Sequence, residues 1–198
     1  LEIVKEEAFN ALHGYMSNAG FEDVRQTIAQ SINERFGTSF SEKNLIMTVG
    51  AASGLNVILK SILNPGDQVI VFAPYFVEYD GYVRNYDGEV VRISPDTETF
   101  MPKLDEFEEK ITKRTKAVII NNPNNPTGRA IRQETVRKLA AACRDTGTLL
   151  AVDECFCEFM EDWQSFSVIP LLKEFDNLFV LKAFTKLYAM AGLRLGYG

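Results

Sequence analysis

Short apolar runs alternate along the chain with longer stretches in which apolar residues recur at helical spacing. The run Val118-Ile119-Ile120 has no polar alternation, which is typical of a parallel strand that is buried on both faces. Strands that alternate with helical stretches favour an α/β layered fold. Seven segments are predicted to be strands: Leu45–Val49, Gln68–Ala73, Glu89–Ile93, Ala117–Asn121, Leu149–Val152, Leu178–Ala183 and Leu195–Tyr197.

The stretches between these strands have helical periodicity. The first is Phe21–Phe36, which Gly37 then ends. Its apolar residues are Phe21, Val24, Ile28, Ile32 and Phe36. Further helices are predicted at Ala51–Leu63, Phe76–Tyr86, Leu104–Ile111 and Arg132–Thr146. We therefore predict one three-layer α/β/α domain over residues 1–198, with a mostly parallel seven-stranded sheet.

Composition narrows the class of protein. Of 198 residues, 46% are hydrophobic and 24% charged, as in a globular protein, and the net charge of −6 argues against nucleic-acid binding. No apolar run of membrane length and no signal peptide is apparent. Three cysteines, an odd number, favour a reduced, cytoplasmic protein. Because Leu1 begins inside helix-like sequence and Gly198 directly follows a strand-like segment, we expect the chain to be part of a longer protein.

Lys186 is the first candidate for chemistry. It follows the apolar stretch Asn177–Phe184, and Arg194 comes eight residues later among glycines. A lysine after a buried strand is well placed to hold an aldehyde cofactor as a Schiff base and to move protons. The structural alternative is a strand-end lysine that extends into solvent.

Asp153 ends the strand-like run Leu149–Val152 and is the second candidate. A carboxylate at the carboxyl end of a parallel strand lies where α/β folds build their sites. It could pair with a protonated pyridine nitrogen, or it could simply cap a turn. We expect its neighbour Glu154 to point elsewhere.

Two loops add candidates. Asn125 lies in the segment Asn122–Gly128, where its amide could donate to a cofactor oxygen, although turn chemistry explains the prolines. Gly50-Ala51-Ala52 lies between a strand and a helix, where small residues let a phosphate approach backbone N–H groups. Tight packing explains these small residues equally well. Arg194 could supply a forked positive partner for the phosphate.

Other reactive residues receive no role. The segment Cys155-Phe156-Cys157 resembles half of a metal site, but no matching Cys or His pair exists, so we expect buried thiols and no metal. His13 is the single histidine, and its neighbours suggest a loop rather than a catalytic group.

The lysine segment, read with Asn122–Gly128 and Ala151–Glu154, resembles the aminotransferase class I/II family of pyridoxal-phosphate (PLP) enzymes of fold type I. The resemblance extends over nearly the whole chain, and it implies the large, PLP-binding domain without its N-terminal arm and small C-terminal domain. It implies a Schiff-base lysine at Lys186, a pyridine partner at Asp153 and a donor to the phenolic oxygen at Asn125. The remaining implied roles are phosphate binding by Gly50, Ala51, Ala52 and Arg194, stacking by Phe76, and contact with the neighbouring subunit's phosphate by Tyr15.

Three departures from the family pattern stand out. Phe156 occupies a position where many members have a tyrosine that hydrogen-bonds the phenolic oxygen. Ala183 stands where a phosphate-binding Ser or Thr is common, and the adjacent Thr185 could compensate in part. No match is found for the arginine that binds the substrate α-carboxylate in relatives.

The sequence therefore predicts a homodimeric PLP-dependent aminotransferase that acts on an amino acid and a 2-oxo acid, without membrane association. Phe156 and Thr185-Lys186 also resemble threonine-phosphate decarboxylases and the histidinol-phosphate aminotransferase branch. A PLP lyase or decarboxylase on the same fold is therefore one alternative. An inactive cofactor-binding or dimerisation fragment is the other. Phe76, Tyr75 and Tyr79 form an aromatic region near the expected site, which core packing would also explain.

Overall fold

The structure is a computed structural model that describes residues 14–198, so His13 lies outside the described residues. Contacts within the chain separate it into two compact units, one ending at Ile46 and the other spanning Met47–Gly198. The single domain expected over residues 1–198 stays a prediction.

The unit that ends at Ile46 contains helix α3 (Glu22–Phe36) and the short 3₁₀ helix η1 (Glu42–Asn44). Gly37 ends α3 in the left-handed conformation, with φ of 61°, and its N–H donates to the Asn33 carbonyl at 2.8 Å. The Asn33 side chain also donates to the Phe40 carbonyl at 2.8 Å. These bonds fix the chain direction after the helix.

The buried stripe of α3 differs from the predicted one. It consists of Arg25, Ala29 and Ile32, whereas Phe21 and Val24 are 50% and 41% exposed. Arg25 can be buried because its guanidinium donates to the carbonyl groups of Gly20 and Glu42. The apolar pattern of the sequence therefore did not predict that the charged residue Arg25 would be buried in this stripe.

The second unit is built on a seven-stranded sheet in the order β1-β7-β6-β5-β4-β2-β3. The five strands from β3 to β6 in this order are parallel, whereas β7 is antiparallel to both β6 and β1. All seven predicted strands are present, and the mostly parallel sheet is confirmed. Their bounds are β1 Met47–Thr48, β2 Gln68–Phe72, β3 Glu89–Ile93, β4 Thr115–Asn121, β5 Leu149–Asp153, β6 Leu178–Ala183 and β7 Gly196–Tyr197.

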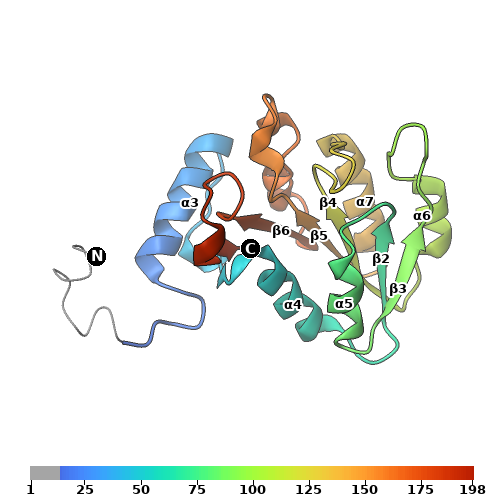
Figure 1. Ribbon diagram of the computed structural model, residues 1–198, viewed down its shortest axis with the longest axis horizontal. Coiled ribbons are helices and arrows are strands. Elements are labelled where there is room, and N and C mark those ends of the chain that lie inside the picture. Colours follow the sequence, from blue (N-terminus) through green and yellow to red (C-terminus); the bar gives the residue numbers. More distant parts are fainter. Residues whose placement is uncertain (1–13) are drawn as a thin grey trace. The chain divides into compact units, whose positions relative to one another are not determined.

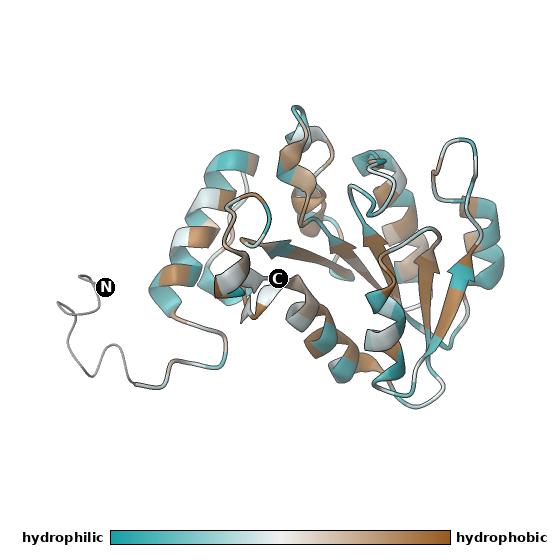
Figure 2. Cartoon of the chain, viewed as in Figure 1, coloured by the Kyte–Doolittle hydropathy of each residue, from teal (hydrophilic) through white to brown (hydrophobic). Residues whose placement is uncertain are grey.

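Helices cover both faces of this sheet, which confirms the three-layer prediction (Figure 1). Helices α4 and α5 lie on one face, and α7 packs on β5 from the other. The strands are the most continuously hydrophobic elements, whereas the helices expose hydrophilic faces (Figure 2). The helices of this unit are α4 Gly50–Ile62, α5 Glu78–Arg84, α6 Leu104–Lys110 and α7 Gln133–Asp145. The 3₁₀ helices are η2 Cys157–Phe159, η3 Trp163–Ser165, η4 Ile169–Lys173 and η5 Ala191–Leu193.

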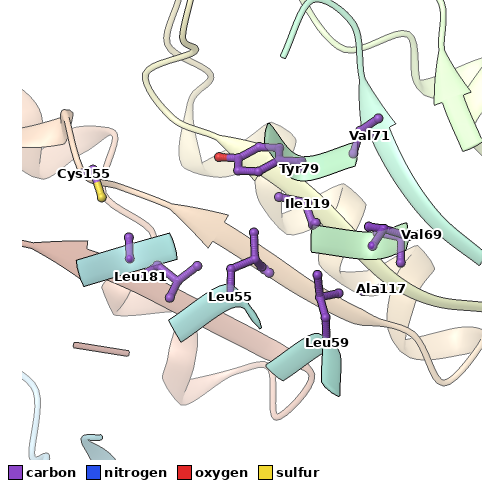
Figure 3. Close-up of a cluster of buried hydrophobic side chains, with 12 residues drawn as sticks. Leu55, Leu59, Val69, Val71, Tyr79, Ala117, Ile119, Cys155 and Leu181 are labelled. Atoms are coloured by element: carbon purple, nitrogen blue, oxygen red, sulfur yellow. The ribbon is translucent and has the colours of Figure 1, made fainter. Parts of the chain in front are cut away.

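The hydrophobic core between the sheet and helices α4 and α5 supports the strands that end at the candidate site. Leu55 and Leu59 of α4 are at most 1% exposed and belong to one buried cluster with Ile119 of β4 and Leu181 of β6 (Figure 3). Fully burying one leucine side chain contributes about 1.5–3 kcal/mol. This packing holds α4 firmly against the strands whose carboxyl ends bear the candidate residues.

Candidate active site

A cavity of about 150 Å³ opens where β4, β5 and β6 end and α4 begins. The carboxyl edge of a parallel sheet is where α/β proteins bind ligands. The cavity has both cationic and anionic side chains in its wall, which suits a ligand that carries charges of both signs. Its lining residues are Ala51, Ala52, Leu55, Phe76, Glu78, Tyr79, Tyr82, Asn121, Asn125, Asp153, Cys155, Phe156, Ala183, Thr185, Lys186 and Arg194.

Asp153 is the last residue of β5, and hydrogen bonds fix both of its carboxylate oxygens. Oδ2 accepts from the Tyr79 hydroxyl at 2.9 Å, and Oδ1 accepts from the Cys155 backbone N–H at 3.0 Å. A carboxylate held from two directions keeps one orientation at the cavity wall. Asp153 is therefore oriented to accept a hydrogen bond from a cationic N–H group of a ligand.

Asn121, at the end of β4, connects the loop Asn122–Gly128 to β5. Its Nδ2 donates to the Asp153 carbonyl at 3.1 Å, while its Oδ1 accepts from the Asn125 N–H at 2.6 Å. Asn124 braces the same loop by donating to the Pro74 carbonyl at 2.8 Å. The turn chemistry expected for this segment is thus present, and it sets Asn125 beside Asp153 in the cavity wall.

Lys186 follows β6 and reaches the cavity, with its Nζ 5.2 Å from the centre of the Phe156 ring. Glu154 points elsewhere, as expected, because its carboxylate is buried beside Lys182.

The N-terminus of α4 and Arg194 form the remaining side of the cavity. Gly50 has φ of 77°, and a Cβ built on it would lie 3.1 Å from Arg194 Nη2. Arg194 itself has φ of 53°, an uncommon conformation for a residue with a side chain. The guanidinium is thus held directly over the first turn of α4, where free backbone N–H groups favour an anion.

Burial suppresses ionisation of several nearby side chains. It raises the pKa of Tyr79 well above its ordinary value, and the Asp153 charge adds to this effect. Burial and the hydrogen bond to Glu78 likewise raise the pKa of Tyr82. Burial also raises the pKa of the Cys155 and Cys157 thiols.

Within residues 14–198, no group of three or more His, Cys, Asp or Glu side chains could hold a metal ion. All three cysteines are free and buried. In the same range, no helix is both long enough and apolar enough to cross a membrane.

Most of the predicted site residues meet at the cavity. Nine line it: Ala51, Ala52, Phe76, Asn125, Asp153, Phe156, Thr185, Lys186 and Arg194. Gly50 lies next to them against Arg194, whereas Tyr15 belongs to the unit that ends at Ile46 and is fully exposed. The roles assigned to these residues stay predictions.

Four further polar residues of the cavity wall were not predicted from the sequence to be site residues: Asn121, Glu78, Tyr82 and Tyr79. Asn121 ends a predicted strand, which was a usable signal. Tyr79 was noted only as part of an aromatic region. Its spacing gave no sign that its hydroxyl contacts Asp153, which is distant in sequence.

A parallel sheet with a charged cavity at its carboxyl edge defines a ligand-binding α/β protein. The chain belongs to the family described as aminotransferase class I and II, whose model matches residues 2–198. Enzymes of this family depend on PLP.

Similar proteins agree with this membership. The chain is 33% identical over 203 residues to a probable aspartate/prephenate aminotransferase of Aquifex aeolicus, covering 99% of the chain and 52% of the relative. It is 34% identical to the aspartate/prephenate aminotransferase of Thermus thermophilus, with the same coverage. A crystal structure of an aminotransferase from Eubacterium rectale superposes with a TM-score of 0.90 at 35% identity, covering 99% of this chain and 50% of that one. The chain spans about half the length of these relatives.

The residues of the cavity fit PLP. The Lys186 amine can react with an aldehyde, Asp153 is fixed to pair with a ring N–H, and Phe76 offers an aromatic face. Arg194 approaches Gly50 so closely that a Cβ there would be crowded, and this close pairing of a guanidinium with a helix N-terminus suits a phosphate.

Proposed function

We propose that the chain is the cofactor-binding part of a PLP-dependent aminotransferase, which exchanges the amino group of an amino acid with the oxo group of a 2-oxo acid. The observation that carries the proposal is the convergence of Lys186, Asp153 and Arg194 on one cavity. These three groups match the aldehyde, ring nitrogen and phosphate of PLP. The aminotransferase names of the similar proteins support amino transfer over the lyase or decarboxylase alternative.

Each residue has a defined task in this proposal. Arg194 and the backbone N–H groups of Gly50, Ala51 and Ala52 bind the phosphate, with a partial contribution from Thr185. Asp153 holds the proton of the ring nitrogen, and Phe76 stacks on the ring. The remaining polar contact is the Asn125 amide, which donates to the phenolic oxygen.

PLP, when bound, supplies an aldehyde for bonding to amines and an electron sink for the pair released at the substrate α-carbon. The protein directs this chemistry through Lys186. Its amine would take the proton from the substrate α-carbon and would deliver it to the cofactor carbon that receives the amino group. Phe156 lies against this amine and keeps water from one side of it.

We further propose a cytoplasmic homodimer with a shared active site. Three free, buried cysteines suit a reducing compartment.

Two features of the surface support the homodimer. The exposed side chain of Tyr15 is available to reach the phosphate of a neighbouring subunit. Exposed apolar side chains beside Lys186 and Arg194 suit burial by another chain. They are Leu187, Tyr188, Leu193 and Leu195.

The cofactor assignment is tested with the purified chain and PLP. We expect a visible absorbance band that borohydride reduction makes permanent, and peptide mapping should place the adduct on Lys186. Lys186→Ala should abolish the adduct, whereas Lys116→Ala, at a lysine outside the cavity, should retain it. No band, or an adduct on another lysine of the unaltered chain, would reject the assignment.

The reaction class is tested by adding amino acids to the PLP-loaded protein. An aminotransferase accumulates pyridoxamine phosphate and releases one equivalent of 2-oxo acid in the absence of an acceptor. A lyase or decarboxylase instead returns to the original visible spectrum with continued product release. The second pattern would replace the proposed function with the lyase alternative.

A further inference from the structure

We infer that Tyr79 is a positioning residue that fixes two partners of the cofactor ring at once, Asp153 through its hydroxyl and Phe76 through its ring. The inference rests on the proposed function, because it concerns the same cavity. It assigns a task to a buried tyrosine that neither the sequence patterns nor the family resemblance singled out.

The first contact is polar. Tyr79, in the first turn of α5, is 2% exposed, and its hydroxyl donates to Asp153 Oδ2 at 2.9 Å. The other oxygen of Asp153 is held from its own loop by the Cys155 N–H. Tyr79 is thus the donor that reaches Asp153 from a different element, so it sets where the carboxylate points relative to α5. Burial raises the pKa of Tyr79 further above its ordinary value of 10.0, so the phenol is a donor at neutral pH.

The second contact is between rings. The Phe76 ring meets the Tyr79 ring edge-on, with centroids 5.7 Å apart and an interplanar angle of 81°. On another side, Tyr75 stacks on Tyr79 at 6.5 Å with an angle of 4°. Phe76 lines the cavity and is only partly buried, so the fully buried Tyr79 ring defines the position of the Phe76 ring.

The core anchors Tyr79 itself. It belongs to the buried cluster that also contains Val71 and Ile119, and Figure 3 shows its hydroxyl pointing away from Val71, to the side on which Cys155 lies. A side chain held this way has little freedom to move. Through this one buried residue, the core supports both the carboxylate of Asp153 and the ring of Phe76.

The test removes the hydroxyl and the ring separately. We expect Tyr79→Phe to weaken PLP binding about tenfold, as loss of a hydrogen bond to a charged group does. Tyr86→Phe is the matched control, because the Tyr86 hydroxyl also joins α4 to the α5 region, through Asn56 at 3.3 Å, but lies outside the cavity wall. Its PLP affinity should stay within about twofold of the unaltered chain. Tyr79→Leu should also change the visible circular dichroism of bound PLP, because Phe76 loses its support.

A carbocyclic analogue, in which carbon replaces the ring nitrogen of PLP, separates positioning from general structural support. Without that nitrogen Asp153 has no ring partner, so Tyr79→Phe should no longer reduce affinity relative to the unaltered chain. Equal affinities of the Phe variant and the unaltered chain for PLP would overturn the inference. The same loss with PLP and with the analogue would also overturn it, because a merely structural effect weakens both.

Failure of this inference can be told apart from failure of the proposed function. The function is read from the borohydride adduct on Lys186 of the unaltered chain. If that adduct forms and the variants behave alike, the function stands and the role of Tyr79 is rejected. If the adduct is absent, the proposed function is rejected first, and the inference falls with it.

Discussion

The ammonium nitrogen of Lys182 lies 3.2 Å from Oε2 of Glu154, and these side chains are 4% and 0% exposed. Glu158 pairs with the same nitrogen at 2.5 Å, and the Ser167 hydroxyl donates to Glu154 at 2.8 Å. Burial alone would lower the pKa of Lys182, but the two carboxylates outweigh it and raise the pKa above its ordinary value. This network joins β6 to the end of β5, the two strands that lead to Lys186 and Asp153.

Lys182→Met should destabilise the fold by about 3–5 kcal/mol, because it removes the ion-pair partner of the fully buried Glu154 carboxylate. The matched control is Arg137→Met. It removes a surface pair with Glu174, in which the side chains are 46% and 45% exposed, and should cost about 0–1 kcal/mol. Urea unfolding of both variants measures the difference. Equal costs would show that the buried network contributes no more than the surface pair.

The fold could be predicted largely because its strands are unambiguous. Val118-Ile119-Ile120 is apolar on both faces, and turn signals such as Asn64-Pro65-Gly66 separate the elements. Element ends were less accurate. Helix α5 was expected to begin at Phe76 but begins at Glu78, since Phe76 turns into the cavity wall. The buried stripe of α3 could not be predicted, because the burial of Arg25 depends on carbonyl groups outside the helix.

Sequence reasoning found the candidate site where residues lie within recognisable motifs. Lys186 and Asn125 come shortly after strands and Asp153 ends one, and parallel strands bring their carboxyl ends together. Tyr79 was missed because its hydrogen bond joins α5 to β5 across 74 positions of sequence. Tertiary packing creates such a contact, and no local pattern of residues encodes it.

Gly50→Ala should weaken binding of PLP about tenfold, because the added Cβ would lie 3.1 Å from Arg194 Nη2 and shift the guanidinium slightly. Backbone strain must be separated from this crowding. Gly147, which follows α7, has φ of 70°, and no atom lies within 4 Å of a Cβ built on it. An alanine at this position therefore introduces backbone strain without crowding a neighbouring group. Gly147→Ala should destabilise the chain by about 1–2 kcal/mol without changing PLP affinity. Similar affinities of both variants would contradict a phosphate role for Gly50.

Phe156→Tyr should lower the midpoint pH of the visible absorbance titration of the PLP-loaded chain. The added hydroxyl can donate to the phenolic oxygen of the cofactor and favour its ionised form. Phe159→Tyr is a suitable control, because Phe159 contacts the Phe156 ring but does not line the cavity. A midpoint that is unchanged in the Phe156 variant, or equally shifted in both, would show that residue 156 does not face that oxygen.

Glu106→Gln should reduce stability near neutral pH and flatten its acid dependence. Hydrogen bonds from Lys110 at 2.6 Å and from the Ser94 N–H at 3.1 Å lower the pKa of Glu106 from 4.5 to about 2. A depressed pKa in the folded state means that the ionised carboxylate stabilises the fold above pH 4.5. This contribution is lost as the pH falls from 4.5 towards 2, so the difference between the variant and the unaltered chain should shrink across that window.

Urea unfolding at several pH values tests this dependence. Glu108→Gln, at an exposed position on the same helix, controls for the change of one net charge. If both variants lose stability in parallel at every pH, the effect comes from the net charge. If only Glu106→Gln converges with the unaltered chain below pH 4.5, the contacts with Lys110 and Ser94 are responsible, because protonation removes the charge that these donors stabilise.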